Sequence, residues 1–182
     1  MAHQEHLVSV GSIPTDMDTF VALRDRVAHT PEGGAAVFVV ALLMYANDAA
    51  LGVQALTVAI DRDQLEEGAQ GYKGLQPRRA DLQAFAERNG PQPHIARSYV
   101  TGTSPEQGYA LPAGPLSVRV RDQQVHGETQ GDAAKRFVHS SGADSPRPLG
   151  LRKNNRGLWK ATSWSSLQVG VRPPGTPVDD DL

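Results

Sequence analysis

A run of apolar residues from Ala35 to Ala46 constrains this chain more than any other feature of its sequence. As a helix, a run of this length spans about 18 Å, well short of the ~30 Å hydrocarbon core of a membrane. We therefore expect a helix that lies in a protein core, buried on most of its sides, and not a membrane span. Thr30 and Pro31 mark its start, because threonine is a good N-cap and proline suits the first helical position.

Helical patterns fill most of the first half of the chain. Thr15 is placed to cap a helix whose apolar residues recur at helical spacing up to Val27. Further helices are predicted over residues 49–60 and 78–88, the second of which ends at an Asn-Gly pair. The glycine-rich segment 61–77 is predicted to be a loop with short helical pieces.

Alternating apolar and polar residues replace this pattern after Pro93. In the predicted strand 157–162, alternation sends Trp159 inward and Lys160 outward. Because the helices come first and the strands follow with short connections, the sequence predicts an α+β fold, with an N-terminal helical half packed on a C-terminal, mainly antiparallel β-sheet. The predicted strands cover residues 95–101, 116–121, 135–140, 149–153, 157–162 and 167–172.

The length of 182 residues suits one domain. We expect a flexible N-terminus (1–14), a single α+β domain (15–172, with a helical half 15–90 and a sheet half 93–172) and a disordered acidic tail (173–182). The chain has no cysteine and no recognisable secretory signal, so we expect it in the cytoplasm. The absence of cysteine also excludes disulfides, thiolate nucleophiles and zinc ribbons.

Two stretches carry a family resemblance: residues 95–112 (IARSYVTGTSPEQGYALP) and residues 137–174, which contain SSGADSPRP, GLWK and SSLQVGVR. They resemble an uncharacterised bacterial domain-of-unknown-function family, in which a helical first half precedes this signature. The resemblance implies no activity, cofactor or catalytic residue.

The segment from His139 to Ser145 contains every residue type of a hydrolase triad. A triad is assembled from distant positions, so residues this close in one loop are predicted to shape turns instead, and we predict no catalytic residue. Elaborate polar loops favour a non-enzymatic module that binds a protein partner. The contact candidates are Ser141, Asp144, Ser145, Arg147, Lys153, Arg156, Trp164, Ser165 and Ser166.

A basic stretch runs from Ser145 to Val178 and contains no acidic residue. Six of the 18 basic residues of the chain fall there, which leaves 12 basic against 20 acidic residues elsewhere. Such a stretch can pack against the acidic part of the chain or bind an acidic protein. A weaker alternative is binding of an anion or nucleic acid through the residues between 147 and 172, chiefly Arg152, Lys153, Arg156 and Lys160.

A further alternative is a small-ligand binder or an enzyme, because helices packed on a curved antiparallel sheet can enclose a pocket. The strand GLWKAT (157–162) resembles the last strands of the cone-shaped folds of the nuclear-transport-factor-2-like superfamily. That likeness implies a fold and no function. Six scattered histidines without cysteine give weak support to a metal site, and we predict neither a metal nor a cofactor.

Overall fold

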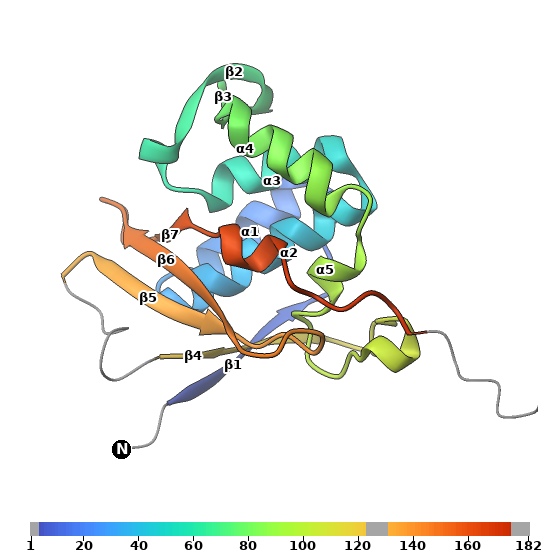
Figure 1. Cartoon of the computed structure of the whole chain (residues 1–182). Helices are drawn as coiled ribbons and strands as arrows, with labels where there is room; N and C mark the ends of the chain where they lie inside the picture. The colour runs from blue at the N-terminus through green and yellow to red at the C-terminus, as the bar shows by residue number, and fades with distance from the viewer. Residues whose placement is uncertain (1–3, 123–130, 176–182) are drawn as a thin grey trace, which may run out of the picture.

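Helix α2 (Pro31–Asn47) runs through the centre of the molecule (Figure 1). The computed structural model describes residues 4–122 and 131–175. Thr30 caps α2, since its hydroxyl oxygen accepts a hydrogen bond from the Gly33 amide at 3.0 Å. Every residue from Gly33 to Tyr45 is buried, so both the start of the helix and its burial are as the sequence predicts.

A five-stranded antiparallel sheet packs against α2, which contacts each of the five strands. Its strand order is β1-β4-β5-β6-β7. The predicted α+β class, with helices packed on a mainly antiparallel sheet, is confirmed. In β4 the predicted alternation holds, with Leu116, Val118 and Val120 buried and the residues between them half-buried. The strands are β1 (Glu5–Gly11), β4 (Leu116–Arg121), β5 (Ala133–Val138), β6 (Arg147–Lys153) and β7 (Trp159–Ser163).

The remaining helices cover the sides of α2 that the sheet leaves open. Both α1 and α3 contact α2 and each other. Asp16 rather than Thr15 caps α1, because the Asp16 carboxylate accepts from the Thr19 amide at 2.7 Å. The helices are α1 (Met17–Val27), α3 (Ala49–Ala59), α4 (Arg79–Ala84) with its π-helical continuation η2 (Phe85–Asn89), α5 (His94–Arg97), and the 3-10 turns η1 (Arg62–Gln64), η3 (Pro105–Gln107) and η4 (Ser165–Gln168).

Segment 61–77, predicted as a loop with short helical pieces, contains one short helical piece, η1, but most of it is not a loop. It forms an antiparallel hairpin of β2 (Leu65–Tyr72) and β3 (Leu75–Pro77), which lies beside α3 at the top of Figure 1. Lys73 and Gly74 make the turn, with φ of 52° and 82°, the pair of positive angles that suits the twist of a two-residue hairpin. The glycines that indicated a loop lie within the hairpin, where a Cβ on Gly68 would lie 2.1 Å from Gln76 Cδ.

Three further segments depart from expectation. Residues 5–11, expected to be flexible, form the edge strand β1, with Val8 and Val10 turned toward the core. Residues 95–101 do not form the predicted strand: α5 ends at Arg97, a turn follows, and only Val100 bridges the sheet, at Val118 of β4. Residues 167–172 do not close the sheet; side chains bind their backbone instead.

Two of those backbone contacts come from distant elements. The Tyr99 hydroxyl donates to Leu167 O at 2.6 Å, and Arg147 Nη2 donates to Gly170 O at 2.9 Å. Of the predicted tail, residues 176–182 lie outside the described residues. Within the described residues, no helix is long and apolar enough to cross a membrane.

Gly34 allows α2 to approach β7 closely. A Cβ at Gly34 would lie 2.7 Å from Trp159 O and 2.8 Å from Trp159 Cβ. Helix propensity alone favours alanine over glycine by about 1 kcal/mol. We nevertheless expect Gly34→Ala to lower the free energy of unfolding by about 1–3 kcal/mol, because the added methyl group meets backbone that cannot move freely. Urea denaturation measures this difference, and a stabilised variant would contradict the close packing.

Candidate functional site

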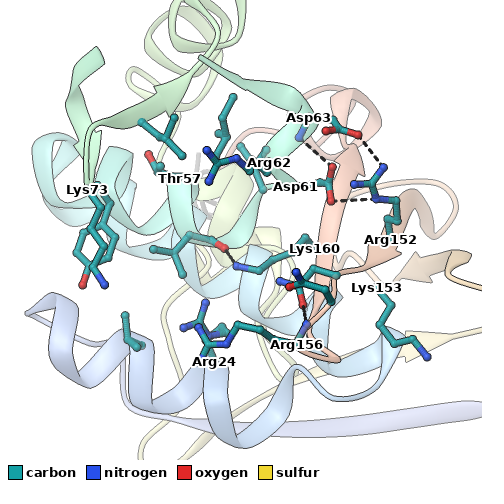
Figure 2. A pocket seen from close by; sticks show the side chains of 18 of the residues that line it. Arg24, Thr57, Asp61, Arg62, Asp63, Lys73, Arg152, Lys153, Arg156 and Lys160 are labelled. Carbon is teal, nitrogen blue, oxygen red and sulfur yellow. Dashed lines mark hydrogen bonds and ion pairs between the residues drawn. The ribbon is translucent and has the colours of Figure 1, made fainter. Parts of the chain in front are cut away.

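An open cleft of about 780 Å³ lies where the helices meet the edge of the sheet (Figure 2). Its walls come from α1, from the end of α3 and the residues after it, from the β2–β3 hairpin, and from the turn between β6 and β7. The volume is within the range of sites for small molecules. The cleft therefore has the position and size of a ligand site.

Positive charge predominates in this cleft. Among the described residues its lining has seven basic and three acidic side chains. All three carboxylates are paired: Arg152 contacts Asp61 at 3.3 Å and Asp63 at 2.7 Å, and Lys153 Nζ lies 3.6 Å from Asp132. The pairing leaves an excess of cations, which are Arg24, Arg62, Lys73, Arg156 and Lys160.

Lys160 is the most unusual of these cations, because it is only 9% exposed. The prediction that it points outward from the sheet to solvent was wrong. The residues that follow α3 pair with the edge of β7, where the Asp61 amide donates to Ala161 O at 2.8 Å. Lys160 Nζ donates a hydrogen bond to Val58 O in the last turn of α3, where the helix dipole favours a cation.

Two arginines lie near this ammonium group. Burial, and then the charges of Arg24 and Arg156, lower the pKa of Lys160 to about 8, against a smaller opposing effect of Asp61 and Asp25. Arg24 is 8% exposed, and its Nε donates to Asp25 Oδ1 at 2.7 Å. Arg156 is exposed on the β6–β7 turn. We call Arg24, Arg156 and Lys160 the cation cluster; Figure 2 shows them together in the lower part of the cleft.

Local sequence explains the position of Arg156. The Asn154 side-chain oxygen accepts from the Arg156 and Leu158 amides, each at 3.0 Å, and Gly157 has a φ of 78°. This is the tight turn that the sequence predicts for Asn154–Gly157. It fixes the backbone that carries Arg156 at the mouth of the cleft.

Apolar side chains form another part of the lining. Leu65, Tyr72 and Leu75 reach the cleft from the hairpin, and Val21 and Ile60 reach it from the helical side. Leu65 and Tyr72 are partly buried against the core. The cleft thus combines a charged region with an apolar wall.

The contact candidates selected from the sequence divide between two places. Lys153 and Arg156 line the cleft. The Ser141 hydroxyl lies 2.9 Å from that of Thr103, while Asp144 and Ser145 are exposed on the loop that follows. Arg147 Nη2 bonds to the carbonyls of the C-terminal segment.

The other three candidates lie around η4. Trp164 is 6% exposed and stacks on Phe85, with ring centroids 6.2 Å apart and planes 9° apart, so most of this ring belongs to the core. Ser165 is exposed and Ser166 is half-buried. With Trp164 they line a second hollow of about 300 Å³, which we call the η4 hollow.

The triad-like residues do not converge. His139 is exposed, whereas Ser140 is buried and its hydroxyl donates to the Ser98 hydroxyl at 2.8 Å. Burial and then the charge of Arg119 lower the pKa of His139. Within the described residues, no group of three or more histidine or acidic side chains is placed to hold a metal ion.

Sequence reasoning missed the contribution of the helical half. Arg24, Arg62 and Lys73 line the cleft but are not among the candidate residues selected from the sequence. Their approach to the β6–β7 turn depends on how the hairpin and α1 pack against the sheet. No local pattern in the sequence signals that arrangement.

The buried lysine should make stability depend on pH. The pKa of Lys160 is about 8 in the folded protein, against an ordinary value of 10.5, so the unfolded chain binds more protons between these values and stability rises with pH there. Lys160→Met lacks this rise. We expect the unfolding free energy of the wild type, relative to the variant, to increase by up to about 3 kcal/mol between pH 7 and pH 10. Urea denaturation of both proteins at the two pH values measures it; a constant difference would contradict the burial of a charged amine.

Comparison with known proteins identifies the family of this chain. No curated protein and no solved structure matches the chain. The profile of the family described as Domain of unknown function (DUF6935) matches residues 12–175. That range contains the fold from the approach to α1 onward, including the cleft and the η4 hollow. The chain belongs to this domain-of-unknown-function family, DUF6935.

Proposed function

We propose that this protein binds a small anionic molecule in the cleft between the helices and the sheet edge. The observation that carries the proposal is the cation cluster. Its three positive charges share one hydrogen-bonded carboxylate, that of Asp25, which is 51% exposed. Like charges brought together in a partly buried site repel one another, and a bound anion would relieve that repulsion.

The other charges nearby do not remove this excess. Asp61 is 2% exposed but pairs with Arg152, which also holds Asp63. Cation excess in a concave site of this volume suits a molecule of metabolite size. The alternative of a small-ligand binder, raised from the sequence, is therefore the one that the geometry supports best.

Binding of nucleic acid has weaker support. Arg147, Arg152 and Lys153 of the basic stretch are occupied by contacts within the chain. Arg152 and Lys153 pair with acidic residues, and Arg147 binds backbone carbonyls. What remains is a localised cluster and not the long basic track that a nucleic-acid backbone requires.

A protein partner is a second candidate, and it has a different location. Val169, the residue after η4, is 45% exposed, and Ser165, which lines the η4 hollow, is exposed as well. An apolar side chain among small polar ones suits a protein contact. As the second candidate, we assign to this face the interaction role that the polar loops predict.

A thermal-shift panel tests the anion proposal. Carboxylates, phosphate esters, sulfate esters and a short oligonucleotide would each be added at low salt. At a ligand concentration of 100 times Kd, linkage adds about 2.7 kcal/mol, which is about 5–10 °C in Tm for a domain of this size. We expect at least one small anion to produce this shift in the wild type.

A matched pair of variants locates the effect. Arg156→Gln removes an exposed cation of the cleft, and Arg88→Gln removes an exposed arginine outside its lining. We expect the shift to fall in the first variant and to stay in the second. No shift with any anion, or equal shifts in both variants, would contradict a ligand site in the cleft.

The second candidate has its own test. A photo-crosslinking amino acid in place of Ser165 is compared with one in place of Arg88, which is exposed on η2 and does not line the η4 hollow. We expect one protein to be crosslinked reproducibly from position 165 and not from position 88. Identical adducts from both positions, or none from position 165, would exclude a specific contact there.

A further inference from the structure

We infer that Arg24, Arg156 and Lys160 form a subsite for the phosphate group of a phosphomonoester whose apolar body lies against the β2–β3 hairpin. The inference rests on the proposed function and narrows it to one chemical class. It joins two features of the same cleft, the cation cluster and the apolar wall.

The donors still free in the cluster favour phosphate over carboxylate. Arg24 uses Nε for Asp25, which leaves its two Nη groups, and Lys160 uses one N–H for Val58 O, which leaves two. The Arg156 side chain has no hydrogen bond or ion pair with any residue that the structure describes. Three cationic groups on three different elements match the three terminal oxygens of a phosphomonoester, whereas a carboxylate offers two in one plane.

The charge of a phosphomonoester also matches the charge of the cation cluster. A phosphomonoester carries about −1.5 to −2 at pH 7. The cation cluster, reduced by the one carboxylate of Asp25, can accept such a group without burying an unpaired anion. A singly charged carboxylate would leave more of the repulsion around Lys160 in place.

The hairpin supplies the surface for the rest of the ligand. Leu65, Tyr72 and Leu75 line the cleft from β2 and β3, and a ring or short apolar chain can pack on them. Lys73 Nζ lies 5.5 Å from the centre of the Tyr72 ring. A phosphate ester with an aromatic body should therefore bind more tightly than inorganic phosphate.

Affinity should depend on pH in a way that identifies Lys160. The charged groups around its amine are Arg24 and Asp25 on α1, Asp61 after α3, and Arg156 on the turn. A phosphomonoester becomes a dianion above a pKa of about 6, and Lys160 loses its proton near pH 8. Affinity is then greatest between these values and falls on both sides.

Isothermal titration calorimetry with phenyl phosphate, inorganic phosphate and benzoate tests the subsite. We expect the order of affinity phenyl phosphate, then inorganic phosphate, with benzoate weakest. Arg156→Gln should weaken phenyl phosphate about tenfold to a hundredfold, the effect of losing a charge-assisted hydrogen bond. Arg88→Gln, an exposed arginine outside the cleft, should bind as the wild type does.

Lys160→Arg provides the second variant. Arginine stays protonated throughout, so the loss of affinity above pH 8 should disappear while phenyl phosphate still binds. A merely structural lysine would leave the alkaline limb of the profile unchanged. If Lys160→Arg impairs folding because the side chain is buried, Arg156→Gln still tests the role of the cation cluster in binding.

The outcomes separate the two proposals. Tighter binding of benzoate than of phenyl phosphate, with the same dependence on Arg156, would overturn the phosphate subsite and leave the anion site standing. Binding of phenyl phosphate that neither Arg156→Gln nor pH above 8 weakens would also overturn the subsite. No binding of any of the three probes would overturn it as well, and the thermal-shift panel then decides the broader proposal.

Discussion

The burial of α2 is the constraint on which the rest of the structure depends. A helix that is apolar around its whole circumference is stable only when neighbouring elements cover each side. The five-stranded sheet covers one side, and α1 and α3 cover others. Gly34 lets the sheet approach closely at Trp159. The fold can thus be understood as the set of elements needed to remove this one helix from water.

The same requirement creates the cleft. Asp48 ends α2 and caps α3, so that α3 folds back along its predecessor. The end of α3 then meets the outer edge of β7, where Ile60 bridges Ala161 and Lys160 contacts the carbonyl of Val58. Because α3 continues into the β2–β3 hairpin, an apolar wall lies beside this charged corner. Packing of the core therefore places charged and apolar groups around one concave surface.

The sequence predicted those features that depend on neighbouring residues. The Thr30 cap, the alternation in β4 and the turn at Asn154–Gly157 each follow from local chemistry. The hairpin was not predicted because glycines usually indicate loops, whereas here they allow Gln76 and neighbouring backbone to pack closely. The burial of Lys160 was not predicted, because strand alternation indicates a solvent-exposed face only where no distant element packs near that side chain. The cation cluster, which joins α1, β7 and the β6–β7 turn, is a tertiary feature of the same kind.

The central claim is that the cation cluster binds an anion and that the protonated form of Lys160 contributes to this binding. The most direct measurement is an NMR titration of the Lys160 Nζ resonance, without and with saturating phenyl phosphate. We expect a pKa near 8 in the free protein, and a higher pKa in the complex, because a bound dianion stabilises the ammonium form. An unchanged pKa under conditions where phenyl phosphate is bound would contradict the claim.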